Sequence, residues 1–467
     1  MSAAFRSGSW RALWLALLVL ASWQCTAAAT RVLAITQVAV IDVMHGRASA
    51  PQTVLVEDDR IGAIGTHITI PPGAQRIDGR GKYLVPGLID LHVHLFNNAS
   101  HRAPNEWAFA LFVANGVTGV REMNTTPDEL AQVKQWREGV ARGTLLAPHV
   151  LAAGVFPGAD SDEQAQRAVR EAAQRGADFI KVFSEVTPPR WRMILDVANE
   201  SHLPVDGHVP AAVSLLDAAR AGQRTAEHLM QAYEACSSRE HAMLDARQGL
   251  DANAAVALRD AQEREVLETF DPAVCAHVAK ALAATRQTQV PTIVLEYFDP
   301  ARPREDFQAD PRWPLLRADE QERWRRNLKQ ADSDRALAEL RWNVTCRIVR
   351  TFHAAGVTIL PGTDAPMPLV YPGYALHDEL EQLVGCGLSH AQALRAATSG
   401  AARLLGLKDI GSVQRGLRAD LLLLDADPLR DVRNLRRIDA VALAGRWLDR
   451  AALDALLAGT RPAATTH

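Results

Sequence analysis

Short apolar runs alternate with amphipathic segments through the middle of the chain, over residues 85–407. The amphipathic segments repeat Ala, Leu, Arg and Glu at a helical spacing, as in 162–175 and 213–221. The apolar runs have the length and composition of strands, and eight stand out: 85–91, 116–121, 148–152, 177–183, 204–208, 224–228, 290–295 and 358–361. Strands alternating with helices predict an α/β fold, and eight repeats favour a (β/α)8 TIM barrel. A doubly wound sheet alternates similarly, but no Gly-rich phosphate loop follows the first run.

The two ends of the chain have a different pattern from the middle. Residues 30–84 and 408–455 contain short alternating or apolar runs broken by Gly, Pro and Asp, which is typical of antiparallel strands. We expect both ends to form one composite β-sandwich domain into which the barrel is inserted. Two long interruptions of the barrel, at about 232–289 and 296–340, predict additional structure over its mouth, with the second forming a flap.

Residues 1–29 have the pattern of a signal peptide. Two arginines precede the apolar run 13–21, and Ala27, Ala28 and Ala29 offer small residues for cleavage. The sequence therefore predicts an exported protein, periplasmic or secreted, without stable membrane association once the signal is removed; an uncleaved anchor is the alternative. Export places the remaining cysteines in an oxidising compartment. Three complete pairings of these four residues stay open: Cys236, Cys275, Cys346 and Cys386.

Composition and charge narrow the choice of partners. Of the 467 residues, 48% are hydrophobic and 22% charged, and the formal net charge is −3. These values are ordinary for a soluble globular protein. The sequence has no basic stripe interleaved with aromatic residues, so it does not predict nucleic-acid binding. A small-molecule substrate is the expected partner, and a homo-oligomer stays open.

The first apolar run of the barrel ends in His92-Val93-His94. Alternate residues of a strand share a face, so His92 and His94 point the same way and can bind one metal ion together. A lone pair of this kind is more often structural than metal-binding. The polar residues that end later runs change this interpretation.

Lys181 lies inside the apolar run 178–183, where a lysine must be paired or neutral because burying an ammonium group is unfavourable. A pair with a carboxylate such as Glu122 is one interpretation, and a neutral amine that reacts with carbon dioxide is the other. His208 and His228 each end a run, and singly each is more often a satisfied polar residue than a ligand. Asp364 follows the last run, where it could also be an N-cap.

Together, His92-Val93-His94, Lys181, His208, His228 and Gly362-Thr363-Asp364 resemble the metal-dependent amidohydrolase superfamily. The resemblance is strongest to its branch of imidazolonepropionase-like proteins and prolidase-type dipeptidases. It extends to Pro86-Gly87-Leu88-Ile89-Asp90 and to the closing segments 376–380, 393–398 and 416–420, so it spans nearly the whole chain after the signal. The family implies a barrel with a composite β domain.

The resemblance also implies roles for these residues. His92, His94 and Asp364 would bind one divalent metal, His208 and His228 a second, and carboxylated Lys181 would bridge both. Zinc suits such ligands, and two metals would share a bridging hydroxide that attacks the carbonyl. Asp364 would act as general acid–base catalyst. The sequence departs from the Gly-rich prolidase-type pattern at Ser184-Glu185-Val186, which leaves the carboxylation and the metal count open.

Substrate contacts are predicted from loop position alone. Tyr233, Tyr374 and His149 are the candidates, with Arg121 as a further one, and each could equally be a packing residue. We expect an exported hydrolase of amide or peptide-like C–N bonds, such as a dipeptidase or N-acyl amino acid hydrolase. The alternatives are a mononuclear cyclic-amide hydrolase or deaminase, and a non-catalytic metal-binding barrel protein.

Overall fold

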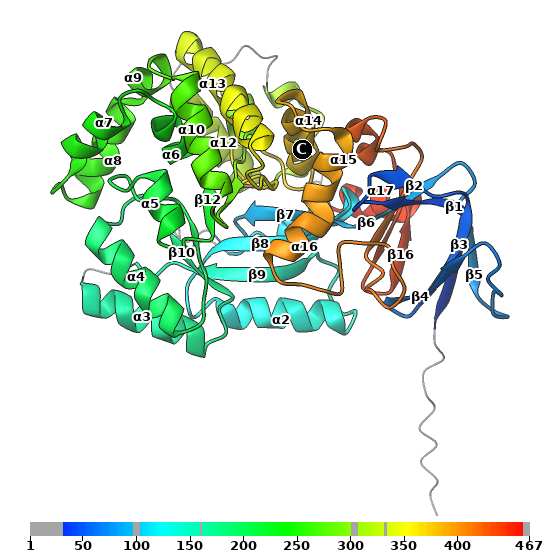
Figure 1. Cartoon of the computed structure of the whole chain (residues 1–467). Helices are drawn as coiled ribbons and strands as arrows, with labels where there is room; N and C mark the ends of the chain where they lie inside the picture. The colour runs from blue at the N-terminus through cyan, green and yellow to red at the C-terminus, as the bar shows by residue number, and fades with distance from the viewer. Residues whose placement is uncertain (1–30, 97–102, 159–160, 300–306, 331–333, 461–467) are drawn as a thin grey trace, which may run out of the picture.

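The computed structural model describes residues 31–96, 103–158, 161–299, 307–330 and 334–460. The predicted signal peptide, 1–29, lies outside the described residues. Figure 1 shows an α/β body on one side of the molecule and, on the other, a group of strands that come from both ends of the chain. Within the described ranges, no helix has the length and apolar character needed to cross a membrane.

Strands from the two chain ends form one nine-stranded sheet, in the order β16-β15-β14-β6-β1-β3-β4, with β2 and β5 also paired to β1. Their bounds are β1 (Val32–Asp42), β2 (Arg47–Ala48), β3 (Gln52–Glu57), β4 (Arg60–Gly65), β5 (Gln75–Asp78), β6 (Tyr83–Pro86), β14 (Leu421–Leu424), β15 (Ile438–Leu443) and β16 (Arg446–Asp449). The ends meet where β14 pairs antiparallel with β6, from Leu421 opposite Pro86 to Leu424 opposite Tyr83. The sandwich architecture and the domain boundaries stay predictions.

The four leucines of β14 are all buried, and they face two different cores. Leu421 and Leu423 pack with the β-rich part of the molecule. Leu422 and Leu424 pack with the large core of the α/β body. Successive side chains of a strand point to opposite faces, so one unbroken apolar run serves both cores.

The α/β body contains a five-stranded parallel sheet in the order β11-β10-β9-β8-β7. Its strands are β7 (Leu88–Val93), β8 (Val117–Thr125), β9 (His149–Val155), β10 (Phe179–Val182) and β11 (Val205–Gly207). The helices between these strands are α1 (Phe109–Ala114), α2 (Leu130–Ala141), α3 (Asp162–Gln174) and α4 (Pro188–Glu200), and Figure 1 shows α2 to α4 along one side of the sheet. This confirms the α/β prediction.

The strands after β11 are joined less continuously. β12 (Thr225–Glu227) and β13 (Thr288–Val290) form a separate parallel pair. The expected eighth strand, 358–361, makes only single bridges, Ile359 to β13 and, further along, Ala365 to Val93. Pro361 has no amide hydrogen, which limits pairing there. Complete closure of an eight-stranded barrel therefore stays a prediction.

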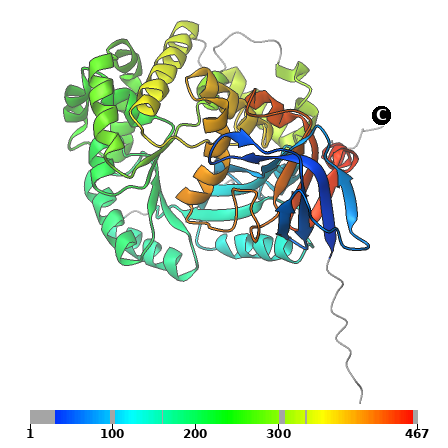
Figure 2. The ribbon, with the colours of Figure 1, turned by 45° about the vertical axis from the view of Figure 1, so that its right-hand side comes forward.

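The interruption at 232–289 is largely helical. It contains α7 (Glu240–Arg247), α8 (Ala252–Ala261), α9 (Glu263–Glu268) and α10 (Pro272–Ala283), which follow α5 (Leu215–Arg220) and α6 (Met230–Ala235). The second interruption, at about 296–340, begins with α11 (Val294–Tyr297) and contains α12 (Ala318–Gln330). The helices that follow are α13 (Arg335–Ala354), α14 (Tyr374–Gly385), α15 (His390–Arg395), α16 (Ala401–Leu404) and α17 (Arg450–Ala458). Figures 1 and 2 place α7 to α9 on the side of the molecule opposite the β-rich part.

Two disulfides cross-link the helices, Cys236 to Cys275 and Cys346 to Cys386. The structure thus selects one of the three pairings that the sequence left open. The bonds close loops of 39 and 40 residues.

Removing the Cys346–Cys386 bond as Cys346→Ser/Cys386→Ser should lower the free energy of unfolding by about 2–5 kcal/mol, because an unfolded chain without the cross-link gains entropy. Denaturant titrations of the wild type with and without reductant provide the comparison. Identical midpoints for the wild type and the double variant under non-reducing conditions would show that this bond does not form.

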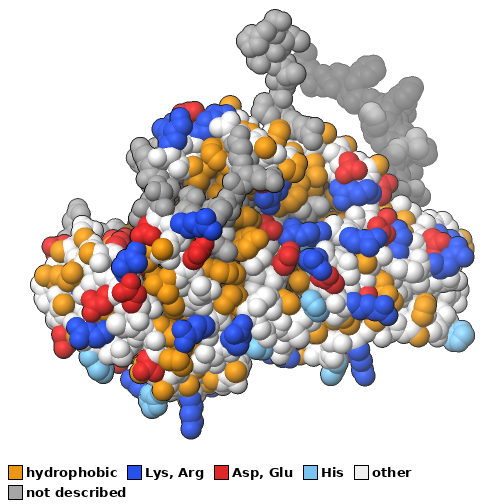
Figure 3. Space-filling view, turned by 90° about the horizontal axis from the view of Figure 1, so that it is seen from above, with side chains coloured by type: hydrophobic (Ala, Val, Ile, Leu, Met, Phe, Trp, Pro, Cys, Tyr) orange, Lys and Arg blue, Asp and Glu red, His pale blue; other side chains and the backbone are white. Residues whose placement is uncertain are grey.

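The surface carries mixed charges. Figure 3 shows the molecule from above, with Lys and Arg side chains interspersed among Asp and Glu. Many exposed charged residues form close ion pairs, such as Arg335 with Glu339 along α13.

Candidate metal centre

His92 and His94 lie at the carboxyl end of β7, and both face one carboxylate. Nε2 of His92 is 3.1 Å from Oδ1 of Asp364, and Nε2 of His94 is 2.8 Å from the same oxygen. The two imidazole rings are 5.3 Å apart between centroids. The shared orientation predicted from the strand period is therefore present in the structure.

Asp364 is held in place by the strand that it faces. Its amide donates a hydrogen bond to the carbonyl of His92 (2.7 Å), and its φ of 64° turns the chain sharply. The preceding Thr363 bonds to the buried Asp90 through its amide and its hydroxyl. The next helix, α14, begins at Tyr374 with Gly373 as its N-cap, so the N-cap interpretation of Asp364 is wrong.

His208 and His228 follow β11 and β12. Their ring centroids are 4.9 Å apart, and the His228 ring is 4.6 Å from that of His92. Nδ1 of His228 bonds to the hydroxyl of Thr292 (2.7 Å), and Nδ1 of His208 to that of Ser184 (3.2 Å). Burial and the neighbouring cations lower the pKa of His228 to about 3 and that of His208 well below its usual value. Both rings are therefore neutral at physiological pH, the form that binds metal.

Lys181 projects from β10 into the same region. Its side chain is fully buried, and Nζ has no hydrogen-bond partner among the described residues. Burial lowers its pKa to about 8. Glu122 does not pair with it, because that carboxylate accepts hydrogen bonds from the amides of Leu95 and Asn124.

The donor atoms fit a divalent metal. One ligand atom each from His92, His228 and Asp364 lies within 4.8 Å of the other two. Nε2 of His92 and Oδ1 of Asp364 are both buried and close, yet neither atom has a hydrogen-bond partner among the residues that the structure describes. Two atoms bound to one zinc are separated by roughly 3 Å, so this spacing suits shared coordination. This compact group joins His228 to His92 and Asp364, and the division of the ligands between two metals stays a prediction.

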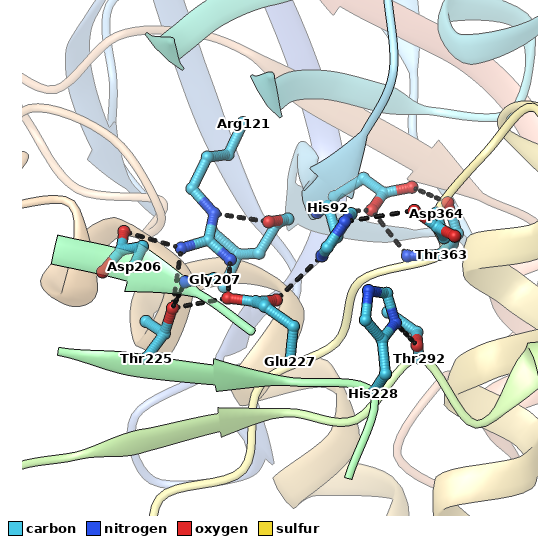
Figure 4. Close-up of polar contacts among 12 residues, drawn as sticks. His92, Arg121, Asp206, Gly207, Thr225, Glu227, His228, Thr292, Thr363 and Asp364 are labelled. Atoms are coloured by element: carbon cyan, nitrogen blue, oxygen red, sulfur yellow. Dashed lines mark hydrogen bonds and ion pairs between the residues drawn. The ribbon is translucent and has the colours of Figure 1, made fainter. Parts of the chain in front are cut away.

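A buried arginine is linked to the centre through a carboxylate. The guanidinium of Arg121 bonds to Asp206 (2.9 Å) and to Glu227 (2.9 Å), and Glu227 bonds to Nδ1 of His92 (2.8 Å), as Figure 4 shows. Although burial opposes ionisation, Arg121 and His92 hold the pKa of Glu227 well below its usual range. A carboxylate on Nδ1 leaves Nε2 as the metal-binding atom.

Sequence reasoning missed Asp206 and Glu227. Both are charged residues inside short apolar strands. Asp206 lies two residues before His208, and Glu227 lies one residue before His228. A charged residue in such a strand, next to a candidate histidine, is a signal that could have identified them. Arg121 was considered as a substrate contact. The structure corrects this hypothesis, because the side chain of Arg121 is completely buried and its guanidinium is bonded to Asp206 and Glu227.

A cavity of about 410 Å³ opens onto the centre and is lined by His94, His208, His228 and Asp364. Tyr233 also lines it, and the tyrosine hydroxyl bonds to that of Thr345 (2.7 Å). Residues of α8 and α9, from the first interruption of the barrel, complete one wall.

Two predicted substrate contacts lie elsewhere. His149 is at the start of β9, away from the strand ends that carry the centre, and its Nε2 is 3.2 Å from Oδ2 of Asp420. Tyr374 begins α14 and packs against a cluster of Trp313, Trp324 and Tyr371. Neither residue is among those that line this cavity, and their roles as substrate contacts stay predictions.

The fold and the site define a class of protein, an α/β protein whose parallel strands carry histidine and aspartate side chains that could hold a metal ion. The sequence profile of the amidohydrolase family matches residues 83–448, which is most of the chain. The chain belongs to the amidohydrolase family, whose members are hydrolases of C–N bonds and generally metal-dependent. This confirms the resemblance found in the sequence.

Solved structures share this fold over nearly the whole chain. A bottromycin amidohydrolase is 25% identical with a TM-score of 0.68, and the alignment covers 92% of this chain and 90% of the other. A proposed prolidase from Bifidobacterium longum is also 25% identical with a TM-score of 0.62, covering 92% and 99%.

Curated relatives match over shorter stretches. The dihydroorotase of Mycobacterium leprae is 36% identical over 138 residues, which are 28% of this chain and 31% of the relative. The imidazolonepropionase of Vibrio cholerae is 51% identical over 45 residues, 10% and 11% of the two chains. The chain thus matches less than a third of the length of these relatives.

Proposed function

We propose that this protein hydrolyses an amide or peptide-like C–N bond with the help of a divalent metal, most simply zinc. The observation that carries the proposal is the convergence of His92, His228 and Asp364 at the cavity, with ligand atoms within 4.8 Å of one another. A bound metal would activate water and polarise the scissile carbonyl.

The residues of the chain would supply proton transfer and orientation. Although burial opposes ionisation, His94 and His92 hold the pKa of Asp364 well below its usual range, so this residue is a carboxylate at neutral pH. It would accept a proton from the attacking water and donate it to the leaving amine. Glu227 and Thr292 would keep the rings of His92 and His228 in one orientation.

We further propose that Lys181 is carboxylated and bridges two metals. A neutral amine attacks carbon dioxide, a C–N bond forms and one proton is released to solvent. Complete burial, the lack of a hydrogen-bond partner among the described residues and the lowered pKa of Lys181 support this step.

Replacing Lys181 by Ala should reduce the bound metal from two ions per chain to one or none and lower activity at least tenfold, because the bridging ligand is lost. Metal content, measured by mass spectrometry of the purified protein, is the primary readout. Lys134→Ala, an exposed change on α2, is the control. Unchanged metal content and activity in Lys181→Ala would exclude the bridged site.

The proposed substrates are dipeptides or N-acyl amino acids, which a cavity of about 410 Å³ can hold. The structural similarity to a proposed prolidase supports this class. A panel of dipeptides, N-acyl amino acids and cyclic amides, assayed before and after chelation, tests it. Absence of metal-dependent turnover on the whole panel would favour a non-catalytic role.

A mononuclear cyclic-amide hydrolase is the second candidate. Within the described part of the chain, one compact group of three candidate ligands was found, and this favours it, as do the short matches to dihydroorotases. One bound metal per chain and turnover that persists in Lys181→Ala would select this alternative.

Export is also part of the proposal, together with closure of the eight-stranded barrel. The signal-like residues 1–29 and the two disulfides support export, because such bonds persist in oxidising compartments. Fractionation of cells that express the full chain tests the location.

A further inference from the structure

Two arginines line the cavity, counting the described residues only, and they differ in their free hydrogen-bonding capacity. Arg341 is enclosed by carboxylates: Nε is 2.5 Å from Glu263, Nη1 is 2.5 Å from Asp299, and Glu296 is 3.6 Å away. A cation with three acidic neighbours has little attraction left for an anionic ligand. Arg341 therefore serves to hold this wall together.

Arg259, on α8, has fewer partners. One oxygen of Asp260 accepts from both Nε (3.1 Å) and Nη2 (2.9 Å), and the hydroxyl of Ser184 accepts from Nη1 (3.0 Å). A guanidinium has five N–H donors. Of the remaining two, one on Nη1 meets only the thioether of Met230 at 3.7 Å, and the second, on Nη2, has no acceptor within the described ranges.

The environment of Arg259 favours a second anion. Its side chain is only 13% exposed, whereas that of Asp260 is 64% exposed. Solvent weakens an ion pair with an exposed carboxylate. A ligand carboxylate inside the cavity would meet the guanidinium where water is largely excluded, and two N–H groups could bind it at once.

Arg259 is linked to the candidate metal centre through Ser184. Ser184 accepts from Arg259 and also contacts Nδ1 of His208 at 3.2 Å. These two hydrogen bonds place Nη1 of Arg259 at most about 6 Å from Nδ1 of His208, a candidate metal ligand. The hydroxyl of Ser184 therefore links α8 to the centre.

We propose that Arg259 is a specificity-determining residue that binds a carboxylate adjacent to the scissile amide. In an acylated amino acid, one nitrogen and one α-carbon separate the scissile carbonyl from the carboxylate, a span of roughly 3–4 Å. A carboxylate this close to the scissile carbonyl needs a cation near the metal ligands, and Arg259 is linked to His208 through the single residue Ser184. The substrate class is therefore amides of amino acids with a free α-carboxylate, and the inference rests on the proposed hydrolysis of C–N bonds.

The first test compares each dipeptide or N-acetyl amino acid with its C-terminal carboxamide, using the metal-loaded enzyme. Wild type should prefer the free acid about 10- to 100-fold in kcat/KM, the usual contribution of a charge-assisted pair. Arg259→Met should remove this preference through KM for the acid, with the carboxamide nearly unaffected. Arg259→Lys should retain part of it, because the charge stays while the two-pronged geometry is lost.

Two further variants separate recognition from a structural role. Asp260→Asn removes the competing carboxylate and should lower KM for the acids about 2- to 5-fold while leaving the carboxamides unchanged. Arg264→Met is the matched control, since that exposed arginine of α9 pairs with Glu268 and Asp334 outside the cavity. Equal acid preference in wild type, Arg259→Met and Arg264→Met would overturn the proposal.

Binding without turnover distinguishes the two levels of inference. Calorimetry with L-leucine and L-leucinamide should show tighter binding of the acid in wild type and equal binding in Arg259→Met. This result without turnover of any amide would support carboxylate recognition and contradict the hydrolase function. Metal-dependent turnover with no discrimination between acid and amide in either assay would leave the function intact and refute the role of Arg259.

Discussion

Asp364→Asn should lower kcat/KM at least 10³-fold while the protein remains folded. General acid–base catalysis contributes about 10²- to 10⁴-fold, and this residue also offers an oxygen to the centre. Asparagine has the same shape as aspartate, and its backbone amide can still donate to the carbonyl of His92. Its side-chain amide, however, cannot accept and return a proton. Steady-state kinetics on the best substrate of the panel provides the measurement.

Two comparisons make this result specific. Asp245→Asn, on the exposed face of α7, removes one carboxylate without touching the cavity and should retain full activity. Metal analysis of Asp364→Asn shows how much of the loss comes from weaker metal binding. Activity within tenfold of wild type would remove Asp364 from the proposed proton transfer.

Arg121→Met should destabilise the protein by about 3–5 kcal/mol. The change leaves the carboxylate of Glu227 buried without its cation, and such an uncompensated charge is strongly unfavourable. The carboxylate of Asp206 is destabilised less, because Arg224 remains bonded to it. Denaturant-induced unfolding at neutral pH measures the effect.

The double variant Arg121→Met/Glu227→Gln should recover part of the lost stability, since a neutral amide needs no cation. Arg335→Met is the control, because its ion pair with Glu339 lies on the surface and should change stability by less than about 1 kcal/mol. An Arg121→Met protein as stable as this control would show that the network does not contribute to folding.

The same network predicts a dependence on pH. The folded-state pKa of Glu227 is depressed, so the contribution of its ion pair is complete above the unfolded value of about 4.3 and decreases as the pH falls below it. The deficit of Arg121→Met relative to wild type should therefore be larger at pH 7 than at pH 4. A deficit that grows on acidification would have the wrong sign.

The sequence predicted the parallel α/β order and the six candidate ligands because the relevant signals are local. A polar residue that ends an apolar run, as His94 or His208 does, marks the carboxyl end of a strand. His149 shows the limit of this reasoning. It also borders a run, but at the start of β9, and a short apolar pattern does not reveal which end faces the centre.

Other features depend on contacts between distant residues. The bonds of Arg121 to Asp206 and Glu227 join residues more than 80 positions apart, so no periodicity could indicate them. The same holds for the disulfide pairing and for the grouping of His228 with His92 and Asp364. Tyr374 was expected in an open loop, but it begins a helix packed against aromatic side chains.

The pairing of β14 with β6 has a consequence for the order of folding. Tyr83 and Leu424 are neighbours in this sheet, although almost the whole α/β body separates them along the chain. A ribosome must therefore release residues beyond Leu424 before either core can close, since the leucines of β14 belong to both. Such long-range pairing is slow to form. Nascent chains that end before β14 should remain sensitive to protease, whereas chains that include β16 should become resistant as one cooperative unit.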